Sequence, residues 1–161
     1  MARVLVAYAT DSGTARDVAA MIADERRHGG DDVDIADLAA EQPSPAGYDL
    51  VVVGSGIHAG YWYTPALDWL TARRDELAQT RVALFNTCLN AARDDMMKTS
   101  LAYNDAPSAI VAPVASASFA GRFVPAQVGF FKRVFLRTLQ QKPKDHVDPV
   151  KIRAWAAGLP V

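Results

Sequence analysis

Cysteine is almost absent from the 161-residue sequence, with Cys88 as its single representative. One thiol cannot form an intramolecular disulfide or, by itself, a thiolate metal site. Histidine is nearly as scarce, and His28, His58 and His146 are scattered along the chain. We therefore expect neither a disulfide framework nor a bound metal.

Long apolar runs are also missing. The run that follows Met1-Ala2-Arg3 ends at Tyr8, which is too short for a signal peptide or a membrane span. Hydrophobic residues nevertheless make up 50% of the sequence and charged residues 22%, a balance typical of a folded globular chain. The length predicts a single domain over residues 1–161, and we expect a cytoplasmic protein.

Acidic residues are absent between Pro107 and Lys144, although the net charge of the whole chain is −1. The basic residues of this stretch are Arg122, Lys132, Arg133, Arg137, Lys142 and Lys144. A basic segment on an otherwise acidic chain predicts an anionic partner, either a lipid headgroup or a carboxylate substrate. Nucleic acid is not expected, because the basic residues lack surrounding net positive charge.

Short, continuous apolar runs predict strands that are covered on both faces. The clear runs are Val4–Tyr8, Leu50–Val53 and Val82–Phe85; the weaker ones are Ala109–Ala117, which Pro113 interrupts, and Val33–Ile35 at an edge. Helical patterns alternate with them over Arg16–Arg27, after Thr64-Pro65 with Thr64 as the N-cap, over Ala91–Tyr103 and over Ile152–Ala157. This alternation predicts an α/β fold, with helices on both faces of a parallel sheet and ligand-binding loops after the strands.

The loop after the first strand, TDSGT, combines three hydroxyls with a flexible Gly13 at the start of a helix. Unpaired N–H groups at a helix N-terminus favour an anion, so the loop predicts a phosphate site. A monophosphate is the better interpretation, because neither a Walker pattern nor a Gly-x-Gly-x-x-Gly pattern is present. The simpler alternative is that Ser12 or Thr10 only caps the helix.

The loop after the third strand, GSGIHAGYWYTP, is rich in glycine and aromatic residues. Tyr61, Trp62 and Tyr63 offer planar surfaces for a flat ring. The alternative is that Trp62 and Tyr63 pack onto the following helix as core, which is expected of one of the three. His58 is the candidate catalytic residue, since it could donate a hydrogen bond or a proton to a ring nitrogen; a lone loop histidine is more often only solvated.

The loop after the fourth strand, NTCLNAAR, brings Asn86 and neighbouring polar groups to the same sheet edge. These groups could bind the polar edge of a heterocycle, while Asn90 could instead cap the next helix. Cys88 is more consistent with a structural thiol than with a redox one.

Together these loops resemble those of the flavodoxin-like FMN-binding family, over nearly the whole chain. Within that family, the sequences GSGIHAGYWY and GRFVPAQVGFFKRVFLRTLQQ, followed by Trp155, are similar to the flavodoxin-type, menaquinone-dependent protoporphyrinogen IX dehydrogenases. The resemblance implies a five-stranded parallel sheet in the order 2-1-3-4-5, FMN as cofactor, and a basic amphipathic helical insertion around residues 122–142.

The resemblance also implies which residues bind FMN. The phosphate would be held by Thr10, Asp11, Ser12, Gly13 and Thr14. The ring would lie between a first group, Ser55, Gly56, Ile57, His58, Ala59, Gly60 and Tyr61, and a second group, Thr87, Cys88 and Leu89. One position departs from the family's pattern, which has Ser or Thr two residues after the glycine where this chain has Ala15.

The basic insertion places Val128, Phe131, Phe135 and Leu139 on one helical face and its cations elsewhere. Such a helix suits the inner face of a membrane or a pocket for an apolar carboxylate, and Arg122, Lys132, Arg133 and Arg137 are the expected contacts. The alternative is an ordinary amphipathic helix packed on the sheet.

The resemblance implies an FMN-dependent oxidoreductase that passes electrons from a reduced porphyrinogen-like substrate to a quinone. Two alternatives remain open: a flavodoxin-type electron carrier, and a protein of the same fold that binds a deazaflavin or another phosphate-bearing ligand. The basic segment argues against the carrier, since electron carriers of this kind resemble acidic proteins that dock by charge.

Overall fold

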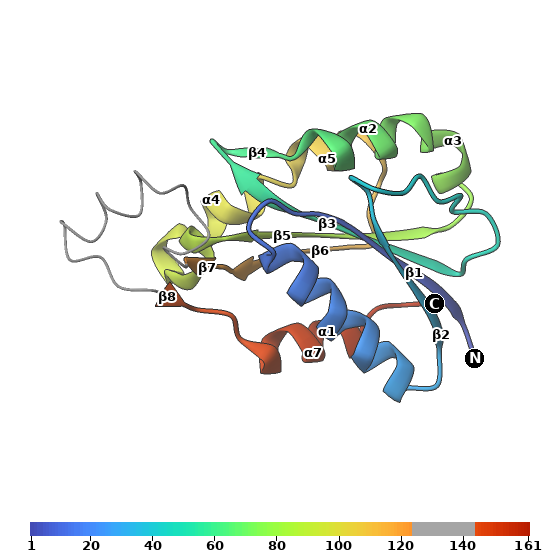
Figure 1. The fold of residues 1–161 in the computed structure, drawn as a ribbon, viewed down its shortest axis with the longest axis horizontal. Coiled ribbons are helices and arrows are strands. Elements are labelled where there is room, and N and C mark those ends of the chain that lie inside the picture. The colour runs from blue at the N-terminus through green and yellow to red at the C-terminus, as the bar shows by residue number, and fades with distance from the viewer. Residues whose placement is uncertain (124–143) are drawn as a thin grey trace.

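The computed structural model of the chain describes residues 1–123 and 144–161. Its centre is a parallel sheet with the strand order β2-β1-β3-β5-β6 (Figure 1). The strands are β1 (Arg3–Ala9), β2 (Asp32–Asp37), β3 (Leu50–His58), β5 (Arg81–Cys88) and β6 (Ala115–Ala120). The short β4 (Tyr61–Trp62) turns back antiparallel onto the end of β3. Counting parallel strands along the chain, this is the predicted order 2-1-3-4-5.

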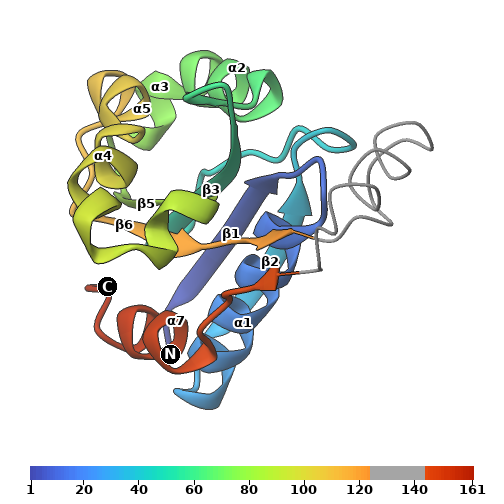
Figure 2. The same cartoon turned by 90° about the vertical axis from the view of Figure 1, so that its left-hand side faces the viewer.

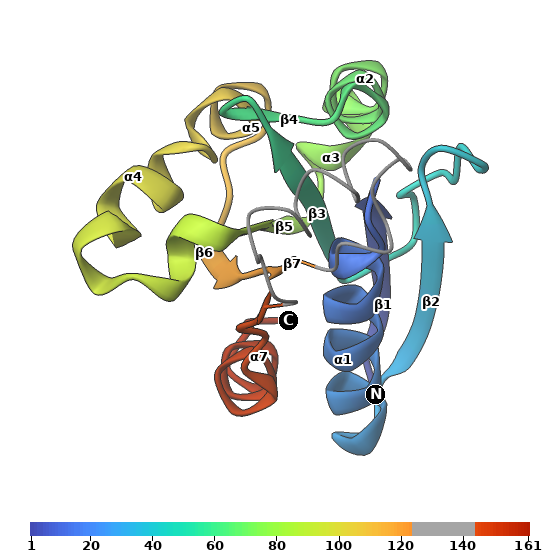
Figure 3. The ribbon, with the colours of Figure 1, turned by 60° about the vertical axis from the view of Figure 1, so that its left-hand side comes forward.

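Helices cover both faces of the sheet (Figure 1, Figure 3). On one face lie α1 (Thr14–His28) and α7 (Pro149–Ala157), which run side by side (Figure 2). On the other lie α2 (Thr64–Ala72), α3 (Arg74–Leu77), α4 (Met97–Ala102) and α5 (Asp105–Ile110), with the 3₁₀ turns η1 (Leu89–Ala92) and η2 (Asp94–Met96) before α4. The α/β prediction is therefore confirmed.

The continuous apolar run of β1 is explained by its two buried faces. Val4, Val6 and Tyr8 belong to the core under α1 and α7. Leu5 and Ala7 belong to the core under α2 and α3. Successive side chains of a strand point to opposite faces, so a strand covered on both sides needs apolar residues at every position.

The buried face of α1 includes a charged residue. Arg26 is 7% exposed and forms an ion pair with Asp31 at 2.6 Å. Its guanidinium also donates hydrogen bonds to the carbonyl oxygens of Ala156 and Leu159, both at 3.1 Å. Arg26 therefore links the end of α1 to the end of α7.

The fourth predicted strand was placed too early. Residues up to Ile110 belong to α5, and β6 begins only at Ala115. Pairing starts after Pro113, where the Val114 N–H donates to the Val82 carbonyl at 2.8 Å. Proline has no N–H to donate, so the strand forms on its far side.

Two predicted helix details were also wrong. Tyr63, in extended conformation, is the N-cap of α2, and Thr64 is already helical. The predicted helix over Ala91–Tyr103 is divided into η1, η2 and α4. The other helices were confirmed with shifted ends, since α1 begins two residues earlier than predicted and α7 three residues earlier.

After β6 the chain enters a two-stranded ribbon, in which β7 (Arg122–Phe123) pairs antiparallel with β8 (Lys144–Asp145). The predicted insertion around 122–142, apart from the two residues of β7, lies outside the described residues, and so do Lys132, Arg133 and Arg137. Among helices in the described part of the chain, none is long and apolar enough to cross a membrane.

Candidate functional site

Three loops meet at the carboxyl ends of β1, β3 and β5, around a cavity of about 170 Å³. The residues that line it are Ser12, Thr14, Gly56, Ile57, Tyr63, Thr87, Cys88, Leu89 and Gly121. All three loops predicted from the sequence contribute, and Gly121 after β6 completes the wall. This edge is where open parallel sheets bind ligands.

The first loop turns into α1 at Gly13. Its φ of +92° lies in the left-handed region that favours glycine, and Gly13 is the helix N-cap without a side-chain capping bond. The Gly13 N–H donates to the Thr10 hydroxyl at 2.9 Å. Neither Ser12 nor Thr10 caps α1, so the simple capping interpretation was wrong and the first N–H groups of the helix stay available for an anion.

Thr14 supplies a hydroxyl to the cavity. Its side chain is only 4% exposed, and its oxygen lies 3.3 Å from the Ser12 hydroxyl. Ala15, by contrast, is 1% exposed and is not among the lining residues. The position that departs from the family's pattern is thus covered by protein, whereas Thr14 faces the cavity.

The second loop is a hairpin formed by the end of β3 and by β4. Ser55 is fully buried, and its hydroxyl donates to the Gly56 carbonyl at 2.7 Å and accepts from the Tyr63 N–H at 2.9 Å. Ser55 therefore holds the two arms of the hairpin together behind the cavity. Ala59, with a φ of 52°, and Gly60 form the exposed tip.

The three aromatic residues of the hairpin have different surroundings. Tyr61 is 71% exposed, whereas Trp62 is 4% exposed and donates from its indole nitrogen to Asn104 at 3.0 Å. Tyr63 lies against Gly56, where an added Cβ would be 2.7 Å from the tyrosine ring. One of the three was predicted to join the core, and Trp62 is the residue that does so.

Tyr63 also lines a second cavity, of about 340 Å³. Here it is joined by Thr10, Asp11, His58 and residues at the start of α2. Burial raises the pKa of the Tyr63 hydroxyl, and the Asp11 carboxylate raises it further. The candidate catalytic residue His58 thus shares the lining of this second cavity with Tyr63, whose raised pKa favours the protonated hydroxyl.

The third loop differs from its prediction at Asn86. This side chain is fully buried within β5, and its NH₂ group donates to the Ser100 carbonyl and to Asn104, both at 2.9 Å. Its oxygen accepts from the Ser118 hydroxyl at 2.7 Å. Asn86 is therefore buried, has both N–H donors paired and does not line the cavity, so the prediction that its side chain binds a heterocycle was wrong.

The residues after Asn86 do reach the cavity. Thr87 is 5% exposed, and its hydroxyl makes no hydrogen bond to the described residues. Cys88 is half-buried, with its sulfur 3.7 Å from the Ser118 hydroxyl, and Leu89 is 43% exposed. Asn90 does not cap a helix; it lies within η1 and donates to the Tyr103 hydroxyl at 3.2 Å.

Asn104 was missed by the sequence analysis. It is 2% exposed, accepts from Trp62 and Asn86, and donates to the Ser116 hydroxyl at 2.8 Å and the Ala117 carbonyl at 3.0 Å. Asparagine is common in loops and turns, so its type and position gave no signal of burial.

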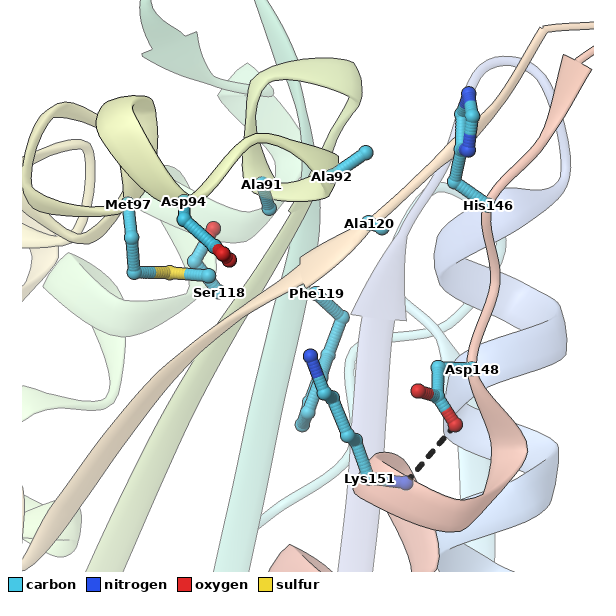
Figure 4. A pocket seen from close by; sticks show the side chains of 10 residues that line it. All are labelled: Ala91, Ala92, Asp94, Met97, Ser118, Phe119, Ala120, His146, Asp148 and Lys151. Atoms are coloured by element: carbon cyan, nitrogen blue, oxygen red, sulfur yellow. Dashed lines mark hydrogen bonds between the residues drawn. The ribbon is translucent and has the colours of Figure 1, made fainter.

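A third cavity, of about 220 Å³, lies behind η1 at the start of α7 (Figure 4). Asp94, Phe119 and Lys151 all line it, and the Lys151 backbone N–H donates to Asp148 at 3.3 Å. The side chains of Asp94, His146 and Lys151 make no hydrogen bond or ion pair with the described residues. Phe119 continues into an aromatic cluster with Trp155, at a centroid distance of 5.5 Å.

No group of three or more His, Cys, Asp or Glu that could hold a metal ion occurs among residues 1–123 and 144–161. Arg122, a predicted substrate or membrane contact, has its backbone in β7, next to Gly121 of the first cavity.

The model of the Flavodoxin domain family matches residues 5–149 of the chain. A comparison with curated proteins finds no match. Among solved structures, oxidised flavodoxin 1 from Bacillus cereus has 16% sequence identity and a TM-score of 0.59, and the match covers 96% of this chain and 95% of the flavodoxin. Flavin mononucleotide is bound in a flavodoxin mutant from Fusobacterium nucleatum, with 12% identity, a TM-score of 0.52 and coverage of 73% and 68%.

Part of a longer protein has a similar fold. Rubredoxin oxygen:oxidoreductase from Desulfovibrio gigas has 14% identity and a TM-score of 0.56; the match covers 97% of this chain but only 37% of that one. At these identities the likenesses show a shared fold.

Proposed function

Because the chain belongs to the flavodoxin domain family, we propose that it binds FMN at the junction of the three loops and works as an FMN-dependent oxidoreductase. Membership of the family indicates FMN as the cofactor. The observation that carries the assignment of the site is the convergence of the three loops, eight residues of which line one cavity together with Gly121.

The residues around this cavity fit the two ends of FMN. For the phosphate there are the first N–H groups of α1 and the hydroxyls of Ser12 and Thr14. For the ring there are the apolar side chains of Ile57 and Leu89, and the Thr87 hydroxyl, which lacks a partner in the described part of the chain. A hydroxyl in the wall of a cavity can donate a hydrogen bond to a polar ligand or accept one from it.

The bound flavin would supply the redox chemistry, while the protein binds, orients and shields it. The second cavity supports an enzyme rather than a simple carrier, because it offers room for a reactant across Tyr63 from the first. In this proposal His58 hydrogen-bonds that reactant or transfers a proton to it, and the protonated Tyr63 hydroxyl donates a hydrogen bond.

We further propose that the substrate is a reduced compound of the protoporphyrinogen type and that the electron acceptor is a quinone. Its support is the sequence resemblance described above and the basic segment, whose cations suit propionate groups or lipid headgroups. Arg122, Lys132, Arg133 and Arg137 would be the contacts, at the inner face of the membrane.

FMN titration of the purified protein, followed by flavin fluorescence and visible absorbance, tests the cofactor. Saturable binding is expected, and its absence would overturn the proposal. Turnover of protoporphyrinogen with a quinone in liposomes then tests the enzyme. Neutralising Lys132, Arg133 and Arg137 should abolish this turnover without changing FMN affinity.

The second candidate is an electron carrier, favoured by the near-complete mutual coverage with the Bacillus cereus flavodoxin. A carrier would bind FMN equally well but would not turn over a small reduced substrate with a quinone. It would instead accept electrons from a reductase and pass them to another redox protein.

A further inference from the structure

The two walls of the proposed FMN site are joined behind the cavity by a buried polar cluster, which we define as Trp62, Asn86, Asn104 and Ser118. All four side chains are at most 8% exposed. Trp62 belongs to the hairpin of the first wall, and Asn86 precedes Thr87 and Cys88 of the second. Asn104, between α4 and α5, lies at the centre.

We infer that Asn104 is a positioning residue for the FMN site, which fixes the returning arm of the hairpin relative to the third loop through its hydrogen bond to Trp62. This inference rests on the proposed function for its ligand, but its structural part can be tested without FMN.

Every hydrogen-bonding group of the Asn104 side chain is used. Its oxygen accepts from the Trp62 indole at 3.0 Å and from Asn86 at 2.9 Å. Its nitrogen donates to Ser116 and Ala117 of β6. An amide with two donors and two lone pairs cannot exceed four bonds, so Asn104 holds the hairpin, β5 and β6 in one arrangement.

Asn86 carries the connection to the second wall. Its oxygen accepts from Ser118, whose hydroxyl lies 3.7 Å from the sulfur of Cys88 in the cavity wall. The cluster therefore extends from the back of the hairpin to the back of the third loop. Fully satisfied buried networks of this kind rigidify the elements that they join.

Apart from the bond of Trp62, the returning arm of the hairpin is held by the short strand β4. β4 contains only Tyr61 and Trp62, and among the strands of the described residues it pairs with β3 alone. The backbone of β3 pairs with β5 as far as Gly56 and Thr87, which holds the outgoing arm of the hairpin. The Ser55 hydroxyl joins the returning arm to the outgoing arm but makes no bond to β5 or β6. Among the side-chain bonds of the described residues, that of Trp62 joins the returning arm of the hairpin to the other wall.

A matched pair of substitutions tests the inference. Trp62→Phe removes one indole N–H from the cluster and keeps an aromatic ring in the core. Trp69→Phe makes the same change in α2, where the indole donates to the Pro43 carbonyl, also at 3.0 Å, and the side chain is fully buried. Both substitutions should lower the free energy of unfolding by a similar amount. A difference between the two variants in FMN binding or in hydrogen exchange therefore reports on the cluster.

With FMN, Trp62→Phe is expected to weaken binding at least fivefold and to shift the midpoint potential and the visible spectrum of the bound flavin. Trp69→Phe is expected to leave all three within error of the wild type. Equal behaviour of the two variants would overturn the inference, because it would show that loss of stability alone explains the change.

Without FMN, hydrogen exchange of the backbone amides of residues 56–63 separates this inference from the proposed function. Faster exchange in Trp62→Phe than in Trp69→Phe supports the tether even if the wild type binds no FMN. Unchanged exchange in Trp62→Phe overturns the tether even if the wild type binds FMN tightly.

Discussion

At the scale of single residues, Thr14 offers a hydroxyl one position before the place where the family's pattern has one and this chain has Ala15. Ala15 lacks the hydroxyl that the pattern would place there, but Ala15 is covered by protein, whereas Thr14 is among the residues that line the cavity. A hydroxyl at position 15 would have to be buried with a partner of its own, which costs free energy when no partner is present.

We predict that Thr14→Val weakens FMN binding by about 1.5–3 kcal/mol, or roughly 12- to 160-fold, because one hydrogen bond to the charged phosphate is lost. Fluorescence titration with FMN measures the change. Thr71→Val is the matched control, since the Thr71 hydroxyl bonds only within α2, to the Leu67 carbonyl at 2.9 Å. Equal affinities for wild type and Thr14→Val would remove Thr14 from the phosphate site.

Tyr63 provides a prediction about pH. Its pKa is raised by burial and then by the Asp11 carboxylate, so the folded state favours the protonated hydroxyl. A raised pKa stabilises the fold fully below the unfolded value of about 10, and this contribution is lost as the pH rises through the folded pKa.

Asp11→Asn should therefore lower the pKa of Tyr63 without returning it to the ordinary value, because burial remains. A pH titration of the tyrosine ring NMR signals, assigned with Tyr63→Phe, measures the Tyr63 midpoint in the wild type and in Asp11→Asn. Tyr48 serves as an internal control, since burial and Asp34 raise its pKa and Asp11 does not. A Tyr63 midpoint that stays constant in Asp11→Asn would contradict the proposed contact.

At the scale of elements, the strands of the central sheet were the most predictable part of the chain. Runs such as Val4–Tyr8 and Val82–Phe85 are apolar at every position because helices cover both faces. The polar ends of β3 and β5 were not predictable in this way. Ser55 and Asn86 look like loop residues, yet they continue the strands because their side chains find buried partners.

The packing of α1 against α7 gives a prediction about stability. Arg26→Met should lower the free energy of unfolding by about 3–5 kcal/mol, because it leaves Asp31 without its buried partner and two carbonyls without a donor. Urea unfolding measures the loss. Arg27→Met, one residue along the same helix, removes one bond to the Val33 carbonyl and should cost about 1 kcal/mol. Similar losses for both variants would contradict the role of Arg26.

At the scale of the whole molecule, the sequence located the site better than it described the site's support. The three loops were recognisable from hydroxyls, glycines and aromatic residues, and they do meet at one edge of the sheet. The role of Asn104 could not be predicted, because it depends on contacts with Trp62 and Ser116, which are distant in the sequence. Contacts of this kind leave no local pattern to read.

FMN should also stabilise the whole fold, because it binds the native state and not the unfolded chain. At a concentration 100 times Kd the gain is about 2.7 kcal/mol, which corresponds to a rise in Tm of roughly 5–11 °C for a domain of this size. Differential scanning fluorimetry measures the rise. Riboflavin, which lacks the phosphate, should give a smaller shift at equal concentration, and an equal shift would argue against the phosphate loop.

The joint packing of α1 and α7 has a consequence for biosynthesis. Ile152 and Ala156 of α7 are fully buried in the same core as Val18 and Ile22 of α1. A ribosome makes β1 and α1 long before α7, so the nascent chain exposes the apolar surface that α7 later covers. Incomplete cores of this kind are prone to aggregation and are the surfaces that chaperones protect. Slow translation of the segment between α1 and α7 would therefore prolong the time for which this apolar surface of the nascent chain is exposed.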